Sequence, residues 1–434
     1  MGNKYKGLLI VLLIFAAAFS IRVLYLAGSP TGIETDEIEH DNLAMRLLEE
    51  RAYVDSDGAA TSYRPPFYAG FLAFIYAIFG HSYFAVRVIQ VIISSITVCI
   101  LYLTAEKIFN KPTAIITGIF SSLYMTFIIC SKMLYTETLF TFLLVSIIYL
   151  AIIAKKPGVK WFCLLGILCG IATLTRSAAV FLPFIVLFIL LPKMRKNKLP
   201  WTKIAAFSLA LALCFLILIV PWTVRNYRAH GKFVLVSTNG GINMYQGLCK
   251  PADGMIFTFP PGSPMSINYD TMSNEAERNN FFMHEAIKIY RTQPLFALKM
   301  FAIRFLFFWN IIDWEILGGN VINFQYIFML PFAFLGTFFA FKENKEIWNI
   351  LIVILYFMSF TLLFPGFSRY RMPIDGYIIL LGSYGIYGFV NKGGQKIYSL
   401  LYVSGYFIFT YFLFKYSAIT KSFVKGFAER IGLW

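Results

Sequence analysis

Carboxylates and arginines gather in a few hydrophilic segments of a 434-residue chain that is otherwise strongly apolar. Residues 29–66 hold nine acids against three arginines, a net charge of −6, while the rest of the chain carries +22. A carboxylate can take the proton of a hydroxyl, and arginines stabilise phosphate and developing negative charge. The combination predicts a site for an anionic substrate and a hydroxyl that needs a base.

Asp36 and His40 are the first candidates in this acidic segment. The acids that begin at Asp36 are typical of a helix start, because negative charge in the first turn complements the helix dipole, and this role alone would explain them. Asp36 and His40 are four residues apart, so they share one helix face at a spacing that also suits metal ligands. With no third ligand nearby, we expect no required metal.

Three further charged residues stand next to expected helix ends. Arg64 precedes Pro65-Pro66, which restrain the backbone and hold this arginine on a stiff segment suited to binding phosphate. The alternative is an interfacial arginine with its head in water. Glu137 begins an apolar run, where the ordinary structural role of such a residue is to cap the start of a helix. Arg176 stands between two short apolar runs, and an arginine recessed there is costly unless it is paired, which favours function.

The composition identifies the class of protein that must position these residues. Hydrophobic residues make up 59% of the chain, charged residues only 14% and aromatic residues 18%. Soluble domains carry about 25% charged residues. The chain is therefore predicted to be an all-α polytopic membrane protein, which excludes a soluble enzyme, a disordered regulator and a disulfide-rich secreted domain. We expect no nucleic-acid partner, because much of the excess Lys and Arg lies in short breaks between apolar runs.

Six basic breaks predict the threading, because short cytoplasmic loops are enriched in Lys and Arg. They lie near residues 4–6, 107–111, 155–160, 193–203, 342–345 and 392–396. Each stretch between neighbouring breaks must then cross an even number of times, which gives about eleven transmembrane helices. The expected spans are 7–28, 84–106, two within 112–154, two short ones within 161–192, 204–221, 322–341, 348–364, 373–390 and 397–414. The last would leave several basic residues outside, against the positive-inside bias. For the span 7–28, the alternative is a cleaved signal peptide, but the apolar run continues past Arg22, which favours an uncleaved helix.

Nearly every distinctive polar residue then falls on the extracytoplasmic side. Two large loops, 29–83 and 222–321, lie there together with the short turns near 131–137, 175–177 and 365–373. The apolar block 67–79 is too short to cross and is expected at the interface, as is the amphipathic segment 281–312. The whole chain, 1–434, is expected to be one transmembrane domain with amphipathic juxtamembrane helices.

Several short motifs, in this order, resemble one family. They are Arg22, Asp36-Glu37, Arg64-Pro65-Pro66-Phe67-Tyr68, Tyr135-Thr136-Glu137-Thr138, Gly170-Ile171-Ala172-Thr173-Leu174-Thr175-Arg176, Pro221-Trp222-Thr223-Val224-Arg225 and Ser368-Arg369-Tyr370-Arg371-Met372-Pro373. Together they resemble the bacterial dolichyl-phosphate-mannose–protein mannosyltransferase-like glycosyltransferases, a superfamily that includes the aminoarabinose transferase of lipid A. The sequence departs from the family in carrying His40 where Tyr is common, and we expect no separate soluble C-terminal domain.

The resemblance implies the GT-C fold and an inverting glycosyltransferase that uses a polyprenyl-phosphate sugar at the extracytoplasmic face of the cell membrane. The acceptor hydroxyl would belong to a lipid, an envelope glycan or a protein. No cofactor or metal is expected. The expected roles are Asp36 as general base, Glu137 as an orienting acid, Arg64, Arg176, Arg225 and Arg369 as ligands of the donor phosphate, and Glu37, His40 and Tyr63 as substrate-binding residues. The alternatives are a lipid or glycan transporter (flippase) and a non-catalytic assembly protein.

Overall fold

The computed structural model describes residues 3–29, 31–34, 36–248, 264–309, 312–313, 321–343, 346–365, 368–391 and 396–415. Nearly all of these residues are helical. The exceptions include two paired two-residue strands, β1 (Ile312–Asp313) and β2 (Val321–Ile322). The expected helical class is confirmed.

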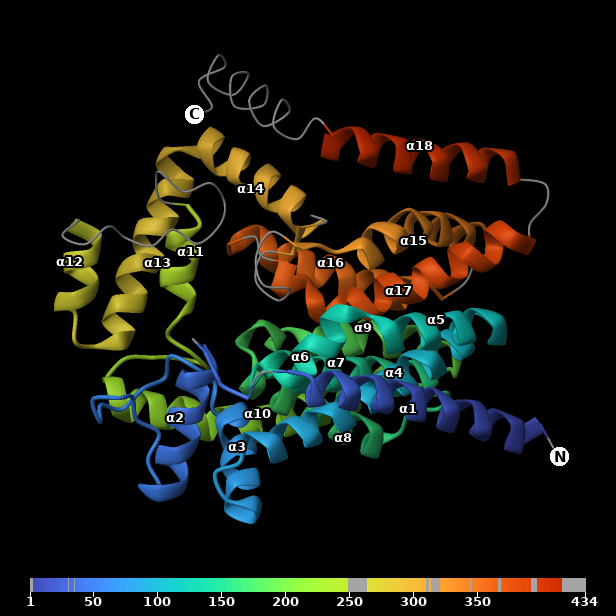
Figure 1. Cartoon of the computed structure of the whole chain (residues 1–434). Helices are drawn as coiled ribbons and strands as arrows, with labels where there is room; N and C mark the ends of the chain where they lie inside the picture. Colours follow the sequence, from blue (N-terminus) through green and yellow to red (C-terminus); the bar gives the residue numbers. More distant parts are fainter. Residues whose placement is uncertain are drawn as a thin grey trace.

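The larger layer is built by helices from the first half of the chain. Its helices are α1 (Asn3–Ala27), α4 (Tyr83–Ile108), α5 (Lys111–Leu123), α6 (Met125–Lys132), α7 (Thr136–Ile153), α8 (Val159–Thr175), α9 (Leu182–Lys196) and α10 (Trp201–His230). They run side by side across Figure 1. Their boundaries follow local chemistry: Asn110 caps α5 by accepting from the Thr113 amide at 2.9 Å, and Gly231 ends α10 in the left-handed conformation.

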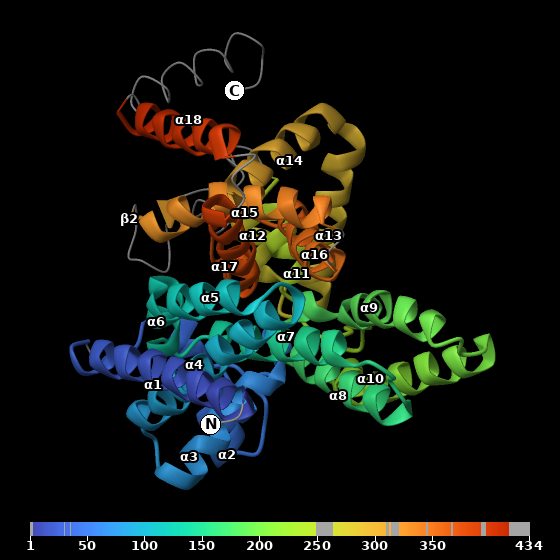
Figure 2. The same ribbon diagram turned by 90° about the vertical axis from the view of Figure 1, so that its right-hand side faces the viewer.

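A second layer packs on the first. It comprises α15 (Phe324–Lys342), α16 (Trp348–Leu363) and α17 (Ser368–Asn391), with α18 (Lys396–Lys415) on its outer side, as Figure 2 shows. α15 and α17 approach closely because Gly336 and Gly385 carry no Cβ, which would overlap the backbone of the opposite helix. Small residues at such crossings are typical of membrane helices.

The remaining helices gather at one end of the bundle, on the left in Figure 1. They are α2 (Asp36–Glu49), α3 (Pro66–Phe79), α11 (Gly240–Gln246), α12 (Pro264–Thr271), α13 (Glu275–Thr292) and α14 (Pro294–Phe308). α2 and α3 fall inside the expected loop 29–83, and the other four inside the expected loop 222–321. The segment 281–312 is predicted as one amphipathic helix, but it is divided between α13 and α14 where Pro294, which has no N–H, starts a new helix.

The number of spanning helices differs from the prediction. Six described helices are long and apolar enough to cross a membrane, and the α5–α6 pair, bent by 47°, would make a seventh. Helices occur at all eleven expected places, but α8 and α16 have only 17 and 16 residues. A span needs about 20 apolar residues, so a count of eleven is not confirmed.

Candidate active site

Arg64 and Arg369 hold Asp36 between them at the first turn of α2. The Asp36 carboxylate accepts from Arg64 Nη2 at 3.0 Å and, through its other oxygen, from Arg369 Nη1 at 2.8 Å. Arg64 also donates to Glu39 Oε2 from Nη2, at 2.7 Å, and from Nε, at 2.9 Å. Arg369 belongs to the first turn of α17, so these contacts join residues 333 positions apart.

Glu137, in the first turn of α7, continues the network. Its Oε1 accepts from Arg369 Nε and, at 2.7 Å, from Arg176 Nη1 at the end of α8. Its side chain is completely buried. The ion-pair chain runs Glu39, Arg64, Asp36, Arg369, Glu137, Arg176, and its three negative and three positive charges cancel. The threading predicted from the basic breaks put all the segments that carry these residues on one side of the membrane. The contacts in the structure bring the residues themselves together.

Residues outside the chain of ion pairs fix its geometry. Glu37 Oε1 accepts from the Leu134 amide at 2.7 Å, which ties the start of α2 to the segment before α7. The Tyr53 hydroxyl donates to the Arg64 carbonyl at 3.1 Å. Pro65 is extended, at φ −62° and ψ 149°, in agreement with the stiff segment predicted around Arg64.

Arg225, predicted to bind donor phosphate, makes other contacts. It donates to the backbone carbonyls of Tyr53, at 2.5 Å, and Thr61, at 2.6 Å, and its guanidinium packs 4.9 Å from the Trp222 ring centroid. It therefore ties α10 to the segment that leads into Arg64. Arg225, Glu37 and Glu137 do not line the cavity that lies beside these ion pairs.

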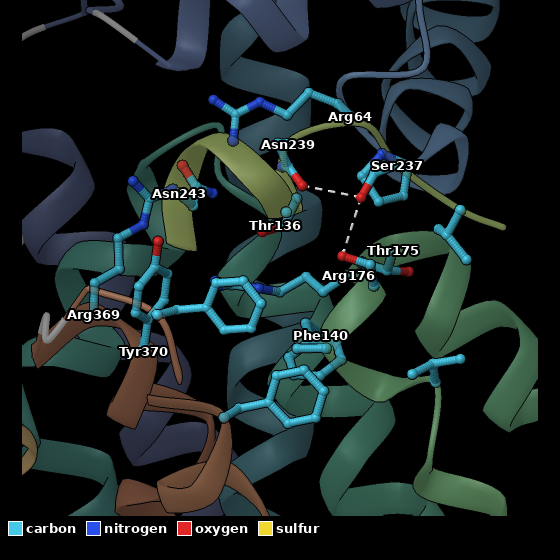
Figure 3. A pocket seen from close by; sticks show the side chains of 18 of the residues that line it. Arg64, Thr136, Phe140, Thr175, Arg176, Ser237, Asn239, Asn243, Arg369 and Tyr370 are labelled. Carbon is cyan, nitrogen blue, oxygen red and sulfur yellow. Dashed lines mark hydrogen bonds between the residues drawn. The ribbon is translucent and has the colours of Figure 1, made fainter. Parts of the chain in front are cut away.

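A cavity of about 640 Å³ opens beside the ion-pair chain. Of the predicted site residues, it is lined by Asp36, His40, Tyr63, Arg64, Arg176 and Arg369. Figure 3 shows three of these arginines around it, with Phe140 below and α11 above. One wall is apolar and contains Phe140, Val180, Phe357, Phe360 and Phe364. The cavity thus offers both positive charge and a hydrocarbon-like surface.

The electrostatics of the cavity fix protonation states. Burial acts to raise the pKa of Asp36, but Arg64 and Arg369 outweigh it and hold the pKa below its usual range, so the carboxylate is ionised. Burial, together with the charge of Arg64, lowers the pKa of His40 to about 3, so the imidazole is neutral. Burial raises the pKa of Tyr63 to about 12, which keeps its hydroxyl a donor.

Polar residues that sequence reasoning missed line the upper side of the cavity. Ser237 Oγ donates to Asn239 Oδ1 at 3.0 Å and can accept from the Ser177 hydroxyl at 3.2 Å, and Asn243 follows one turn later on α11. These are common residue types in a long loop without distinctive spacing, so nothing in the sequence marked them. Among the described residues, no three His, Cys, Asp or Glu side chains are grouped so as to hold a metal ion.

Comparisons with known proteins agree with this architecture. Residues 63–223 match the family model described as dolichyl-phosphate-mannose-protein mannosyltransferase. No curated protein sequence matches the chain significantly. Among solved structures, the archaeal oligosaccharyltransferase AglB from Archaeoglobus fulgidus, in complex with an inhibitory peptide and a dolichol-phosphate, is 13% identical with a TM-score of 0.56. That match covers 90% of this chain and 51% of the other.

Two further structures are similar. The oligosaccharyltransferase of Archaeoglobus fulgidus tethered to an acceptor peptide is 12% identical with a TM-score of 0.57, covering 94% of this chain and 54% of that one. The chain thus spans about half the length of these oligosaccharyltransferases. ArnT from Cupriavidus metallidurans bound to undecaprenyl phosphate is 12% identical, with a TM-score of 0.42 over 89% of this chain and 78% of the other. The expected resemblance is confirmed: this multi-pass membrane protein has the GT-C fold and is similar over residues 63–223 to the dolichyl-phosphate-mannose-protein mannosyltransferases.

Proposed function

We propose that the protein is an inverting glycosyltransferase that moves a sugar from a polyprenyl-phosphate donor to a hydroxyl acceptor at the extracytoplasmic face of the cell membrane. One observation carries the proposal: an ionised carboxylate between two arginines faces a cavity that also has an apolar wall. A phosphate, a lipid chain and a hydroxyl each find a matching surface there. The placement of the basic breaks supports the extracytoplasmic side.

Asp36 is the general base in this reaction. The acceptor oxygen attacks the anomeric carbon and forms the new glycosidic bond while the bond from that carbon to the phosphate oxygen breaks. The bonding electrons leave with the polyprenyl phosphate, and the hydroxyl proton passes to Asp36. Removing the proton matters because a neutral hydroxyl is a weak nucleophile.

Arg64, Arg369 and Arg176 bind the donor phosphate, which gains negative charge as it leaves. Guanidinium groups held in place before the reaction stabilise such charge without reorganisation. Arg64 and Arg369 are also the two partners of Asp36. A phosphate that competes for their N–H groups weakens these ion pairs and raises the proton affinity of Asp36 at the moment when a base is needed.

Glu137, Glu37 and Arg225 position these groups. Glu137 orients Arg369 and Arg176 from a fully buried position. Glu37 fixes the start of α2, and Arg225 holds the segment before Arg64. The apolar wall around Phe140 and Phe357 receives the first part of the polyprenyl chain. His40 and Tyr63 line the cavity as neutral groups that contact substrate.

A transporter is the main rival function. It would place charges near the membrane midplane and build them from repeated halves. Here the ion-pair chain lies at the ends of α7, α8 and α17, which supports a surface reaction rather than a translocation path.

The two functions are separated by following the fate of the sugar. Glycolipids and glycoproteins are compared by mass spectrometry between a strain lacking the protein and the same strain complemented with the parent or with Asp36→Asn. We expect one sugar modification to be lost, restored by the parent and not restored by Asp36→Asn. If the protein is a transporter, the purified protein in vesicles should consume no polyprenyl-phosphate sugar, even when the sugar is supplied on the side where the site opens.

A further inference from the structure

α11 forms the upper side of the cavity and is held rigidly. The chain can pack α11 against α13 because a Cβ at Gly241 would overlap the backbone of Asn279. The Asn279 side chain accepts from the Gly241 amide at 2.7 Å, and the Tyr245 and Phe282 rings lie 5.4 Å apart. α11 is therefore a fixed surface rather than a loose loop.

The opposite face of α11 is directed to the cavity. Asn239 and Asn243, one turn apart, line it together with Ser237 (Figure 3). No described contact occupies the Asn243 side-chain amide, whereas Asn239 Oδ1 accepts from Ser237. The lining residues of this segment are all uncharged: Leu235, Val236, Ser237, Asn239, Gly240, Asn243 and Gln246.

The segment before α11 is also tied to the residues that bind phosphate. Glu275 accepts from the Thr238 hydroxyl at 3.0 Å and from the Thr61 hydroxyl at 2.6 Å. The Thr238 amide donates to the Ser62 carbonyl at 3.0 Å. Arg64 follows two residues after Ser62. The distance between α11 and the Arg64 segment is thereby fixed, as it must be if one surface binds a sugar and the other the phosphate attached to it.

We propose that Asn239, Asn243 and Ser237 form the subsite for the donor sugar and that this sugar is neutral, a hexose or pentose without an amino group. A side-chain amide both donates and accepts hydrogen bonds, which matches sugar hydroxyls. An ammonium group would need a carboxylate, and Asp36, the one carboxylate among the described residues that line the cavity, is already paired with two arginines. This subsite rests on the proposed function.

Binding to the purified full-length protein in nanodiscs tests the subsite. The probes are undecaprenyl phosphate, undecaprenyl phosphate carrying glucose, mannose or galactose, and undecaprenyl phosphate carrying 4-amino-4-deoxyarabinose. We expect the parent to bind at least one neutral glycolipid more tightly than the bare lipid. Asn243→Ala and Asn239→Ala should each weaken that glycolipid roughly threefold to tenfold, as expected for a lost hydrogen bond, with binding of bare undecaprenyl phosphate unchanged.

Two further variants sharpen the result. Asn280→Ala removes an exposed asparagine next to Asn279 on α13 and should change nothing. Asn243→Asp adds a carboxylate and should move the preference towards the amino sugar. A neutral-sugar preference that survives both alanine variants, or a parent that prefers the amino sugar, overturns the subsite while leaving the transferase proposal intact. A parent that binds neither bare nor glycosylated lipid removes both.

Discussion

Arg369 is the residue whose loss should disturb the site most. Its guanidinium is shared between Asp36 and the fully buried Glu137. Arg369→Gln leaves Glu137 with Arg176 and Asp36 with Arg64, so the balanced set of three acids and three arginines acquires a net charge of −1. An excess charge at a buried carboxylate is strongly destabilising, because water cannot replace the missing partner.

The magnitude follows from the exposure of the two partners. A hydrogen bond to a charged group contributes about 1.5–3 kcal/mol. The bond to Glu137 counts in full, whereas the bond to Asp36, whose side chain is 31% exposed, is screened and counts near the lower limit. Because Arg176 still neutralises part of Glu137, we expect Arg369→Gln to lower the free energy of unfolding by about 2–4 kcal/mol.

Thermal unfolding in detergent measures this loss as a double-mutant cycle. Arg369→Gln, Glu137→Gln and the double variant are compared, with Arg228→Gln, an exposed arginine on α10, as the control. The double variant should lose less than the sum of the single losses, by about 1–3 kcal/mol, because it removes both charges of the pair. Additive losses, or an Arg369→Gln variant as stable as Arg228→Gln, would refute the shared-guanidinium reasoning.

Three more predictions follow from the same geometry. His40 is neutral when folded, with a pKa of about 3, but titrates near 6.5 when unfolded; the unfolded chain therefore binds the proton first, and stability should fall by about 2 kcal/mol between pH 7.5 and 5. His40→Gln should reduce that decline, and an unchanged pH profile would contradict the buried neutral imidazole. Arg64→Ala should weaken apparent donor affinity roughly tenfold to a hundredfold, with Arg64→Lys in between because it keeps the charge but not the planar fork; parental donor dependence in Arg64→Ala would exclude the phosphate role. Single cysteines at Asp57 and Lys156 should react from opposite sides of the membrane in intact cells, and labelling of both from one side would invalidate the threading.

Hydropathy and the lysine breaks predicted much of the fold because burial in lipid imposes a length and a composition on each helix. They could not settle how many helices cross, since α8 and α16 are shorter than a span and α5–α6 bends in the middle. Pro294 could have indicated the break between α13 and α14, but the charge pattern runs through it and suggested one helix.

The sequence located the ends of the site better than its contacts. Asp36, Arg64 and Arg369 stand in motifs at expected helix ends, so the predicted topology put them on one side of the membrane without giving the contacts among them. The motif that contains Arg225 looks equally distinctive, yet its guanidinium is occupied by backbone carbonyls. Glu275 joins Thr61 across 214 residues, and no local spacing reveals such a contact. The polar face of α11 was missed for the same reason.

The reaction assigned to Asp36 has one direct test. Initial rates of sugar transfer from a polyprenyl-phosphate donor are measured for the parent, for Asp36→Asn and for Asp57→Asn, an exposed acid of the same acidic segment. Positioned general bases contribute about 100-fold to 10,000-fold to a rate, so Asp36→Asn should lose nearly all transfer while it still binds undecaprenyl phosphate and unfolds cooperatively, and Asp57→Asn should match the parent. An Asp36→Asn variant that is folded and transfers sugar at more than a few per cent of the parental rate would show that Asp36 is not the base.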